Sequence, residues 1–183
     1  MNFYVIQVRT GREQEYRQRA RDVLSGQSIR WPRRNLRIRR AGVWRDCVAP
    51  IFPGYLFLQA EGVDPELYRR MKGLPGFLRF LKDNQHIEPL GPRDREIVVH
   101  FLSYGEIVDR SKAVFDENRR IRVISGPLKD LEGRIVKVDR RKGRARVALE
   151  LYESAFLIDF GFDCLEDAAA QAAQGAQAGQ AHR

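Results

Sequence analysis

Two glycine-containing segments, far apart in the chain, constrain the possible fold most. The segment 51–58, IFPGYLFL, contains a Pro-Gly bend that should lead into an aromatic strand, because Pro53 has no N–H to donate to a sheet. The segment 125–136, SGPLKDLEGRIV, is typical of a strand, a tight turn and a second strand, as in a small barrel. Together they predict a binding protein with two modules rather than an enzyme. The glycines expected at structurally required turns are Gly54, Gly126 and Gly133.

The composition is that of a soluble globular protein. Of 183 residues, 43% are hydrophobic and 31% are charged, and no apolar run approaches the roughly 20 residues of a membrane span. The first residues, MNFYV, begin an alternating strand and do not resemble a signal peptide. We therefore expect a cytoplasmic protein with no membrane partner.

The sequence gives no indication of a metal site or cofactor. Cys47 and Cys164 are far apart and have no CxxC partner, and the three histidines are scattered. A structural zinc site takes four ligands at characteristic spacings, which these residues do not provide. We expect two reduced thiols, no metal, no cofactor and no catalytic residues.

Charge is strongly segregated along the chain, which has a formal net charge of +9. Residues 27–50 contain seven arginines and one acidic residue, and residues 119–146 contain eleven basic and three acidic residues. Residues 147–167 contain six acidic residues and no basic ones. Local fields of one sign favour a polyanionic partner such as nucleic acid.

The pattern of elements predicts an α+β fold with two domains. Strands alternate with helices in the first part, whereas short strands alone fill the second. We expect an α/β sandwich at 1–104, a linker at 105–116, a closed barrel at 117–167 and a disordered tail at 168–183. The strands expected in the sandwich are at 3–9, 51–58 and 77–81. The helices should begin at Thr10, in a capping box with Glu13, at Asp64 or Pro65, and at Pro92. A projecting hairpin is expected at 29–48, with its tip at Ala41-Gly42.

Several short motifs, in order, resemble those of the NusG family of transcription elongation factors. They are Phe3-Tyr4-Val5, Phe52-Pro53-Gly54-Tyr55, Leu74-Pro75-Gly76-Phe77, and Gly126-Pro127 followed by Gly133 and Val136. The resemblance covers about residues 2–166. It implies an N-terminal NGN domain followed by an SH3-like KOW barrel.

The resemblance also implies partners. An NGN domain would bind the clamp helices of RNA polymerase, and the KOW domain would recruit nascent RNA, ribosomal protein S10 or Rho. Phe3 stands where the family usually has tryptophan, and the chain is more basic than the housekeeping factor. It is therefore more similar to a specialised paralogue of the LoaP antiterminator kind. The residues implied in polymerase binding are Phe3, Tyr4, Phe52, Tyr55 and Phe57.

Strand alternation limits which of these rings can face a partner. It places Phe52 and Leu56 on one face and Tyr55 and Phe57 on the other, so Phe52 and Tyr55 rank above Phe57. Packing in the core of the sheet remains the alternative explanation for such aromatic residues.

Basic residues in three places are candidates for contact with RNA or non-template DNA. Two tryptophans lie among the hairpin arginines, and stacking on bases with phosphate contact uses both residue types. In the barrel, alternation turns Ala145 and Val147 to one side and Arg144 and Arg146 to the other. A merely solvated basic surface is the alternative. The candidates are Arg12, Arg17, Arg37, Arg39, Arg40, Arg120, Arg122, Arg140, Arg141, Lys142, Arg144 and Arg146, the barrel members forming one continuous rim.

The leading hypothesis is a bacterial elongation factor that suppresses pausing and termination by stabilising one state of the polymerase. A ribosome-associated or general RNA-binding protein is the alternative, because KOW barrels also occur in ribosomal proteins. A nucleic-acid-modifying enzyme would need a nucleophile elbow, P-loop, carboxylate pair or metal set, and the sequence has none.

Overall fold

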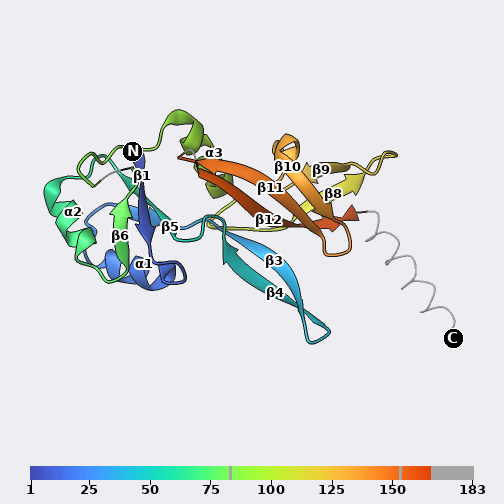
Figure 1. The fold of residues 1–183 in the computed structure, drawn as a ribbon, viewed down its shortest axis with the longest axis horizontal. Coiled ribbons are helices and arrows are strands. Elements are labelled where there is room, and N and C mark those ends of the chain that lie inside the picture. Colours follow the sequence, from blue (N-terminus) through green and yellow to red (C-terminus); the bar gives the residue numbers. More distant parts are fainter. Residues whose placement is uncertain (83, 153, 166–183) are drawn as a thin grey trace. The chain divides into compact units, whose positions relative to one another are not determined.

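The computed structural model describes residues 1–82, 84–152 and 154–165 (Figure 1). These residues form two compact units, which are described separately. Unit 1 comprises Met1–Arg33, Pro50–Glu106 and Glu150–Ser154, and unit 2 comprises Arg34–Ala49, Ile107–Leu149 and the described residues from Ala155 onward. The tail predicted at 168–183 lies outside the described residues. Mixed helix and sheet confirm the α+β class.

Unit 1 is built on a four-stranded sheet with the strand order β2-β5-β1-β6. β1 lies in the centre, antiparallel to β5 and β6, with Tyr4 opposite Leu58 and Ile6 opposite Phe80. These strands are rich in β-branched and aromatic residues, which pack well on a pleated surface. The strand bounds are β1 (Asn2–Val8), β2 (Ser28–Arg30), β5 (Tyr55–Ala60) and β6 (Phe77–Phe80).

Helices cover both faces of this sheet, as expected for the predicted sandwich. The helices are α1 (Glu13–Arg21), α2 (Pro65–Lys72) and α3 (Pro92–Ser103). On one face, Leu56 and Leu58 share a core with Tyr16 of α1 and Met71 of α2. On the other face, ring contacts run from Phe57 through Phe52 to Phe101 of α3.

The helix starts follow the expected chemistry at α2 but not at α1. Asp64 caps α2 by accepting a hydrogen bond of 2.7 Å from the N–H of Leu67. At α1, Arg12 occupies the N-cap position and makes no side-chain cap bond, so the predicted Thr10 capping box is wrong. Gly11 has a φ of +84°, which turns the chain between Thr10 and the helix.

The bend at Pro53-Gly54 changes the predicted alternation. β5 begins only at Tyr55, and Phe52 lies before it, with its carbonyl accepting a hydrogen bond from the N–H of Tyr55. Phe52 therefore packs edge-on against Phe57, with ring centroids 5.7 Å apart, and not on the side of Leu56. The alternation of side chains between the two faces of a strand does not apply here, because the bend is not extended backbone.

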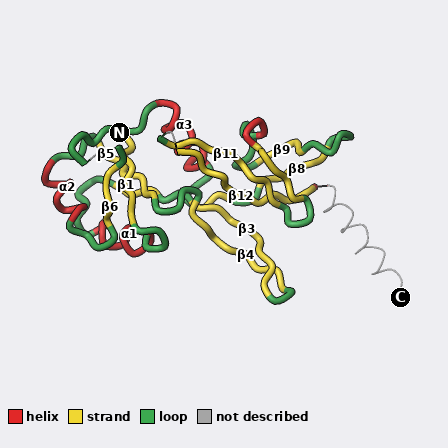
Figure 2. Tube along the Cα trace, viewed as in Figure 1, coloured by secondary structure: helices red, strands yellow, loops and turns green. Residues whose placement is uncertain are grey.

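Unit 2 contains a five-stranded sheet and a three-stranded sheet (Figure 2). The five-stranded order is β10-β11-β12-β8-β9, with β12 parallel to β8 and β9 antiparallel to β8. The bounds are β8 (Ser111–Phe115), β9 (Ile121–Ser125), β10 (Ile135–Asp139), β11 (Arg144–Leu151) and β12 (Ser154–Cys164).

The three-stranded sheet has the order β4-β3-β7, with β3 (Arg33–Arg40), β4 (Val43–Pro50) and β7 (Ile107–Val108). The tip of its β3–β4 hairpin is at Ala41 and Gly42, as predicted, and both residues have positive φ. The linker expected at 105–116 instead contains β7 and β8. These two strands belong to unit 2 and pair with other strands of it, and such long-range pairing leaves little trace in the local sequence.

Glycine is sterically required at only two of the three predicted turn positions. Gly54 has a φ of +81°, and a Cβ there would lie 2.8 Å from Thr10 Oγ1. Gly126 has a φ of +98°, and its Cβ would lie 2.7 Å from the Cα of Ser111. Gly133 differs, because it lies in a short 3-10 helix (Glu132–Arg134) with open space around it and no positive φ. No helix among the described residues has the length and apolar character that a membrane crossing requires.

Candidate functional site

The aromatic residues assigned to polymerase binding are mostly inside unit 1. Phe3, Tyr4, Phe52 and Phe57 are at most 6% exposed, so they form part of the core around the sheet. Tyr55 alone is partly exposed, at the start of β5. Of the two rings ranked highest for facing a partner, Phe52 is buried, so this part of the prediction is wrong, and Tyr55 alone of the five reaches the surface.

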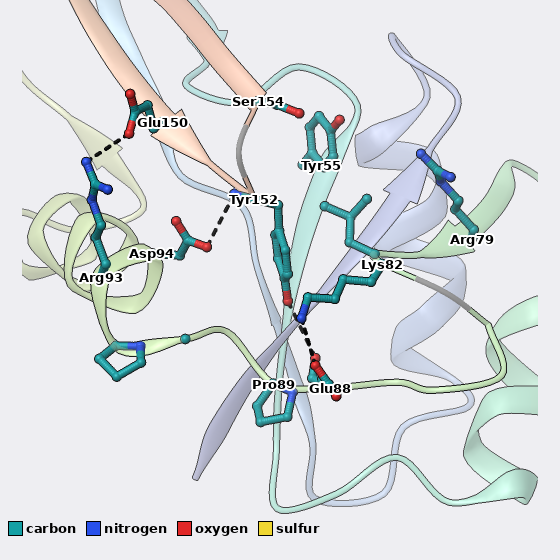
Figure 3. Close-up of a pocket in the computed structure, with 13 residues that line it drawn as sticks. Tyr55, Arg79, Lys82, Glu88, Pro89, Arg93, Asp94, Glu150, Tyr152 and Ser154 are labelled. Atoms are coloured by element: carbon teal, nitrogen blue, oxygen red, sulfur yellow. Dashed lines mark hydrogen bonds and ion pairs between the residues drawn. The ribbon is translucent and has the colours of Figure 1, made fainter.

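Tyr55 lines an open cavity of about 670 Å³ in unit 1 (Figure 3). Charged side chains surround it, and several are paired with one another. Lys82 Nζ donates to Glu88 Oε2 at 2.9 Å, and this pair holds the pKa of the Glu88 carboxyl below its usual range. The lining has three basic and three acidic side chains together with proline and tyrosine, and Arg93 is paired with Glu150, so the cavity has no excess charge of either sign.

Tyr152 also lines this cavity and is its most perturbed titratable group. Its backbone N–H donates to Asp94 Oδ2 at 3.3 Å, and its hydroxyl donates to the carbonyl of Glu88 at 3.5 Å (Figure 3). Burial, with the nearby charges of Asp94 and Glu88, raises the pKa of Tyr152 to about 12. The phenol is therefore a neutral hydrogen-bond donor at physiological pH. No sequence motif indicated this residue.

The two arginines proposed for DNA contact at the start of α1 and within it, Arg12 and Arg17, have partners within unit 1. Arg17 Nη2 lies 2.6 Å from both carboxylate oxygens of Glu106, and Arg12 pairs with Glu15 one turn along the helix. The Arg17 side chain is only 14% exposed. Glu106 lies in the stretch that the sequence suggested was a linker, so nothing local pointed to this pair.

The hairpin of unit 2 presents its basic and aromatic side chains to solvent. Arg37, Arg39 and Arg40 of β3 are all exposed, and Trp44 of β4 is 38% exposed. The Arg37 guanidinium carbon lies 5.8 Å from the centroid of the Trp44 ring, within range of a cation–π contact. Arg39 Nε donates to the carbonyl of Gly42 at 3.0 Å, which fixes the arginine near the tip.

In β11, the predicted alternation agrees with the burial. Ala145 and Val147 are fully buried, while Arg144 and Arg146 lie on the half-buried opposite side. Arg146 makes a two-point contact with Asp159, at 2.7 Å from Nε to Oδ1 and 3.1 Å from Nη2 to Oδ2. This hydrogen bonding lowers the pKa of Asp159, against a smaller opposing effect of burial.

Arg34, from β3, also contacts the β12 residue that pairs with Arg146. Its Nε donates to the backbone carbonyl of Asp159 at 2.6 Å. Burial lowers the pKa of Arg34 to about 10, while the Asp159 charge opposes that shift. Asp159 is thus an acidic centre for the arginines of unit 2, and sequence reasoning missed it within a generally acidic segment.

Two cavities in unit 2 collect most of the remaining candidates. One, of about 180 Å³, is lined by Lys137, Asp139, Lys142, Arg144, Arg146 and Asp159. The other, of about 300 Å³, is lined by Arg37, Ile38, Arg39, Trp44, Arg141, Lys142 and Arg144. Lys142 and Arg144 line both cavities, so the hairpin and the β10–β11 turn form one basic groove.

Three barrel candidates do not line this groove. Arg140 places its guanidinium carbon 4.8 Å from the centroid of the Phe115 ring. Arg120 and Arg122 line neither cavity, because they lie beside and on β9, at the other end of the strand order from β10. Within the described ranges, no cluster of metal-ligand side chains occurs, and Cys47 and Cys164 are free cysteines.

Comparison with known proteins gives two family matches in the order of the modules. Residues 1–99 match the family described as "Transcription termination factor nusG", and residues 117–150 match the KOW motif. These ranges agree with the sequence-based resemblance.

Individual relatives show the same match along the chain. The "Transcription termination/antitermination protein NusG" of Xylella fastidiosa (strain Temecula1) is 25% identical over 176 residues, which cover 87% of this chain and 95% of the relative. The protein of the same name from Pasteurella multocida is 25% identical over 127 residues, 69% of each. A solved structure of Thermotoga maritima NusG has a TM-score of 0.58 and 18% identity, covering 87% of this chain and 93% of that chain. From its two matched modules, in this order, the chain belongs to the NusG family.

Proposed function

We propose that this protein is a bacterial transcription elongation factor that binds the clamp helices of RNA polymerase through its NGN domain and suppresses pausing and termination. The observation that carries the proposal is the match of both modules, at 1–99 and 117–150, in a chain whose relatives are named for termination and antitermination. The chain's net charge of +9 supports a specialised, antiterminating paralogue.

Tyr55 is the proposed contact residue for polymerase. Phe52 and Phe57 are buried and pack against each other, and the carbonyl of Phe52 accepts a hydrogen bond from the N–H of Tyr55, which holds the start of β5 in place. Tyr55 itself is partly exposed beside a cavity. A tyrosine in this setting combines apolar area with a polar tip, a combination enriched at protein interfaces.

The proposed mechanism is a shift between polymerase states and requires no chemical step. A factor that binds the elongating state more tightly than the paused state lowers the paused population by its differential affinity. A coupling of about 1–3 kcal/mol changes that population roughly 5- to 150-fold.

The KOW domain is proposed to recruit nascent RNA. The basic groove of unit 2 supports RNA over ribosomal protein S10 or Rho as its partner, because seven basic side chains line it. Binding of S10 or Rho to the purified chain, unaffected by reversal of these charges, would instead indicate a protein partner. A ribosome-associated role is the alternative, and it predicts cosedimentation with ribosomes and not with polymerase.

The polymerase proposal is tested by transcription on a paused template with the purified chain and the Tyr55→Ala variant. We expect the unmodified chain to shorten pauses and to bind polymerase, and Tyr55→Ala to weaken both effects. Tyr104→Ala is the matched control, because Tyr104 is 41% exposed in unit 1 but lies at the end of α3. Pausing that the unmodified chain leaves unchanged would contradict the proposal.

A further inference from the structure

The basic groove of unit 2 combines residues from two segments far apart in the chain. Arg144 Nη2 donates to the backbone carbonyl of Arg37 at 3.2 Å, which joins β11 directly to the hairpin. Lys142 and Arg144 line the cavities on both sides of this contact. The hairpin and the β10–β11 turn thus form a single surface within unit 2.

The groove is strongly cationic. Its lining has seven basic side chains and two carboxylates, a formal net charge of +5. The two carboxylates already have basic partners, since Asp159 binds Arg146 and Asp139 lies 3.6 Å from Lys142 Nζ. Arg144 Nε is buried without a hydrogen-bond partner among the described residues. The two ion pairs leave five basic side chains of the lining in excess, which favours an anionic ligand.

One aromatic ring lies at the hairpin side of this cationic groove. Trp44 lines the cavity with Arg141 and Lys142 and is 38% exposed, which is unusual for a side chain of this size. The neighbouring Arg37 guanidinium restrains the indole without covering it completely. A stacking platform beside phosphate-binding side chains is the arrangement that binds single-stranded nucleic acid.

An indole can stack only on a base whose face is open. Bases in a duplex are stacked on one another, so this platform favours an unpaired strand. The carboxylate oxygens of Asp139 and Asp159, in the adjoining cavity, each have more than one lone pair, so beside their basic partners they can also accept from a ribose 2′-hydroxyl, which DNA lacks. A strand that has phosphates but no hydroxyl donor would meet only the negative charge of these two carboxylates.

We propose that this groove binds single-stranded RNA, with one unpaired base stacked on Trp44 and the adjoining phosphates held by Arg141, Lys142 and Arg144. The inference rests on the proposed function in that nascent RNA is the natural source of such a strand beside an elongating polymerase. It adds that the hairpin and the KOW domain read the RNA together, through a base platform on one and phosphate contacts on the other.

The test is binding of a short, fluorescein-labelled oligouridylate to the full chain, measured by anisotropy across a salt series. Trp44→Ala should weaken binding at least about 5-fold, the loss expected for one stacked base. Val43→Ala is the matched control, because Val43 is the neighbouring exposed residue of β4 and lines neither cavity. Unchanged affinity of Trp44→Ala would overturn the stacking role.

The salt series tests the phosphate contacts. In a plot of log affinity against log salt, each lost contact should reduce the slope by about 0.7 for a single strand. The double variant Arg141→Gln with Lys142→Gln should therefore lower the slope by about 1.4, whereas Lys129→Gln, outside the groove, should leave it unchanged. Equal slopes for both variants would contradict the phosphate assignment.

Two further ligands test the choice of RNA. The oligodeoxyuridylate of the same length, which differs only in lacking the 2′-hydroxyls, should bind about 3-fold more weakly, since one hydroxyl contact is lost, and duplex RNA should be insensitive to Trp44→Ala. Equal affinity for DNA and RNA would overturn the assignment of RNA. The measurement contains no polymerase, so a failure here leaves the pausing result intact, and a failure of Tyr55→Ala in transcription leaves this result intact.

Discussion

The carboxylate of Glu13, at the start of α1, accepts a hydrogen bond of 2.7 Å from the backbone N–H of Gly54, forty-one positions along the chain. Glu13 is only 3% exposed, and it is one of two buried polar residues in the described part of the chain. The bond fixes the bend before Tyr55 to the first turn of the helix. The position of Tyr55, the candidate contact residue, thus depends on the buried side chain of Glu13.

Replacing Glu13 by alanine should destabilise unit 1 by about 1–3 kcal/mol, because the Gly54 N–H would stay buried without an acceptor. Glu13→Gln keeps an acceptor oxygen and should cost clearly less. Urea unfolding of both variants, followed by the fluorescence of the buried Trp31 in a Trp44→Phe background, measures this difference. Equal losses for the two variants would show that the bond to Gly54 is not responsible.

Gly54→Ala should destabilise unit 1 by about 1–3 kcal/mol, because alanine is strained at positive φ and its Cβ would meet Thr10 Oγ1 at 2.8 Å. Gly62→Ala is the matched control: Gly62 has open space and no positive φ, so its stability should be unchanged or slightly higher. Thermal unfolding of the two variants compares them. A stable Gly54→Ala protein would contradict the structure of the bend.

Phe52→Ala should lose about 3–5 kcal/mol of stability, because Phe52 is 1% exposed and packs against Phe57 and Phe101. Loss of polymerase binding in this variant would therefore reflect a damaged core. Phe52→Leu should lose less, since it leaves a smaller cavity. Urea unfolding of both variants distinguishes this expectation from that for a surface ring, whose removal would leave stability within about 0.5 kcal/mol.

Asp159→Asn should lower the thermal midpoint at neutral pH and have little effect in acid. Hydrogen bonding with Arg146 lowers the folded-state pKa of Asp159, so its contribution is fully present above the ordinary pKa of about 3.9 and is lost as the pH falls through the lower folded value. Calorimetry of both proteins at several pH values from neutral down to about pH 2 measures the change. A difference that persists in acid would show that the charge is not its source.

The local sequence was sufficient for several elements of both units. Asp64 followed by Pro65 located the start of α2, and Ala41-Gly42 located the hairpin tip, because caps and tight turns depend on nearest neighbours. Alternation also gave the buried and exposed sides of β11 correctly, since a regular strand has a period of two.

The same reasoning failed wherever regularity was interrupted or a partner was distant. The bend at Gly54 changed the side on which Phe52 lies, and four of the five predicted contact rings are core residues. The expected linker contributes β7 and β8. The sequence did not predict them, because a short strand is stabilised mainly by the strand it pairs with and its own residues indicate it only weakly.

The family, the order of the two modules and the excess of positive charge could all be predicted before the fold was known, because they depend on motifs and composition. Tertiary structure alone decided which charges act together. Arg17 is paired by Glu106, Arg146 by Asp159, and Arg37 is brought beside Arg144, each through contacts between segments distant in the chain. Pairing in space, which folding sets, determines whether an arginine is neutralised or left for a partner.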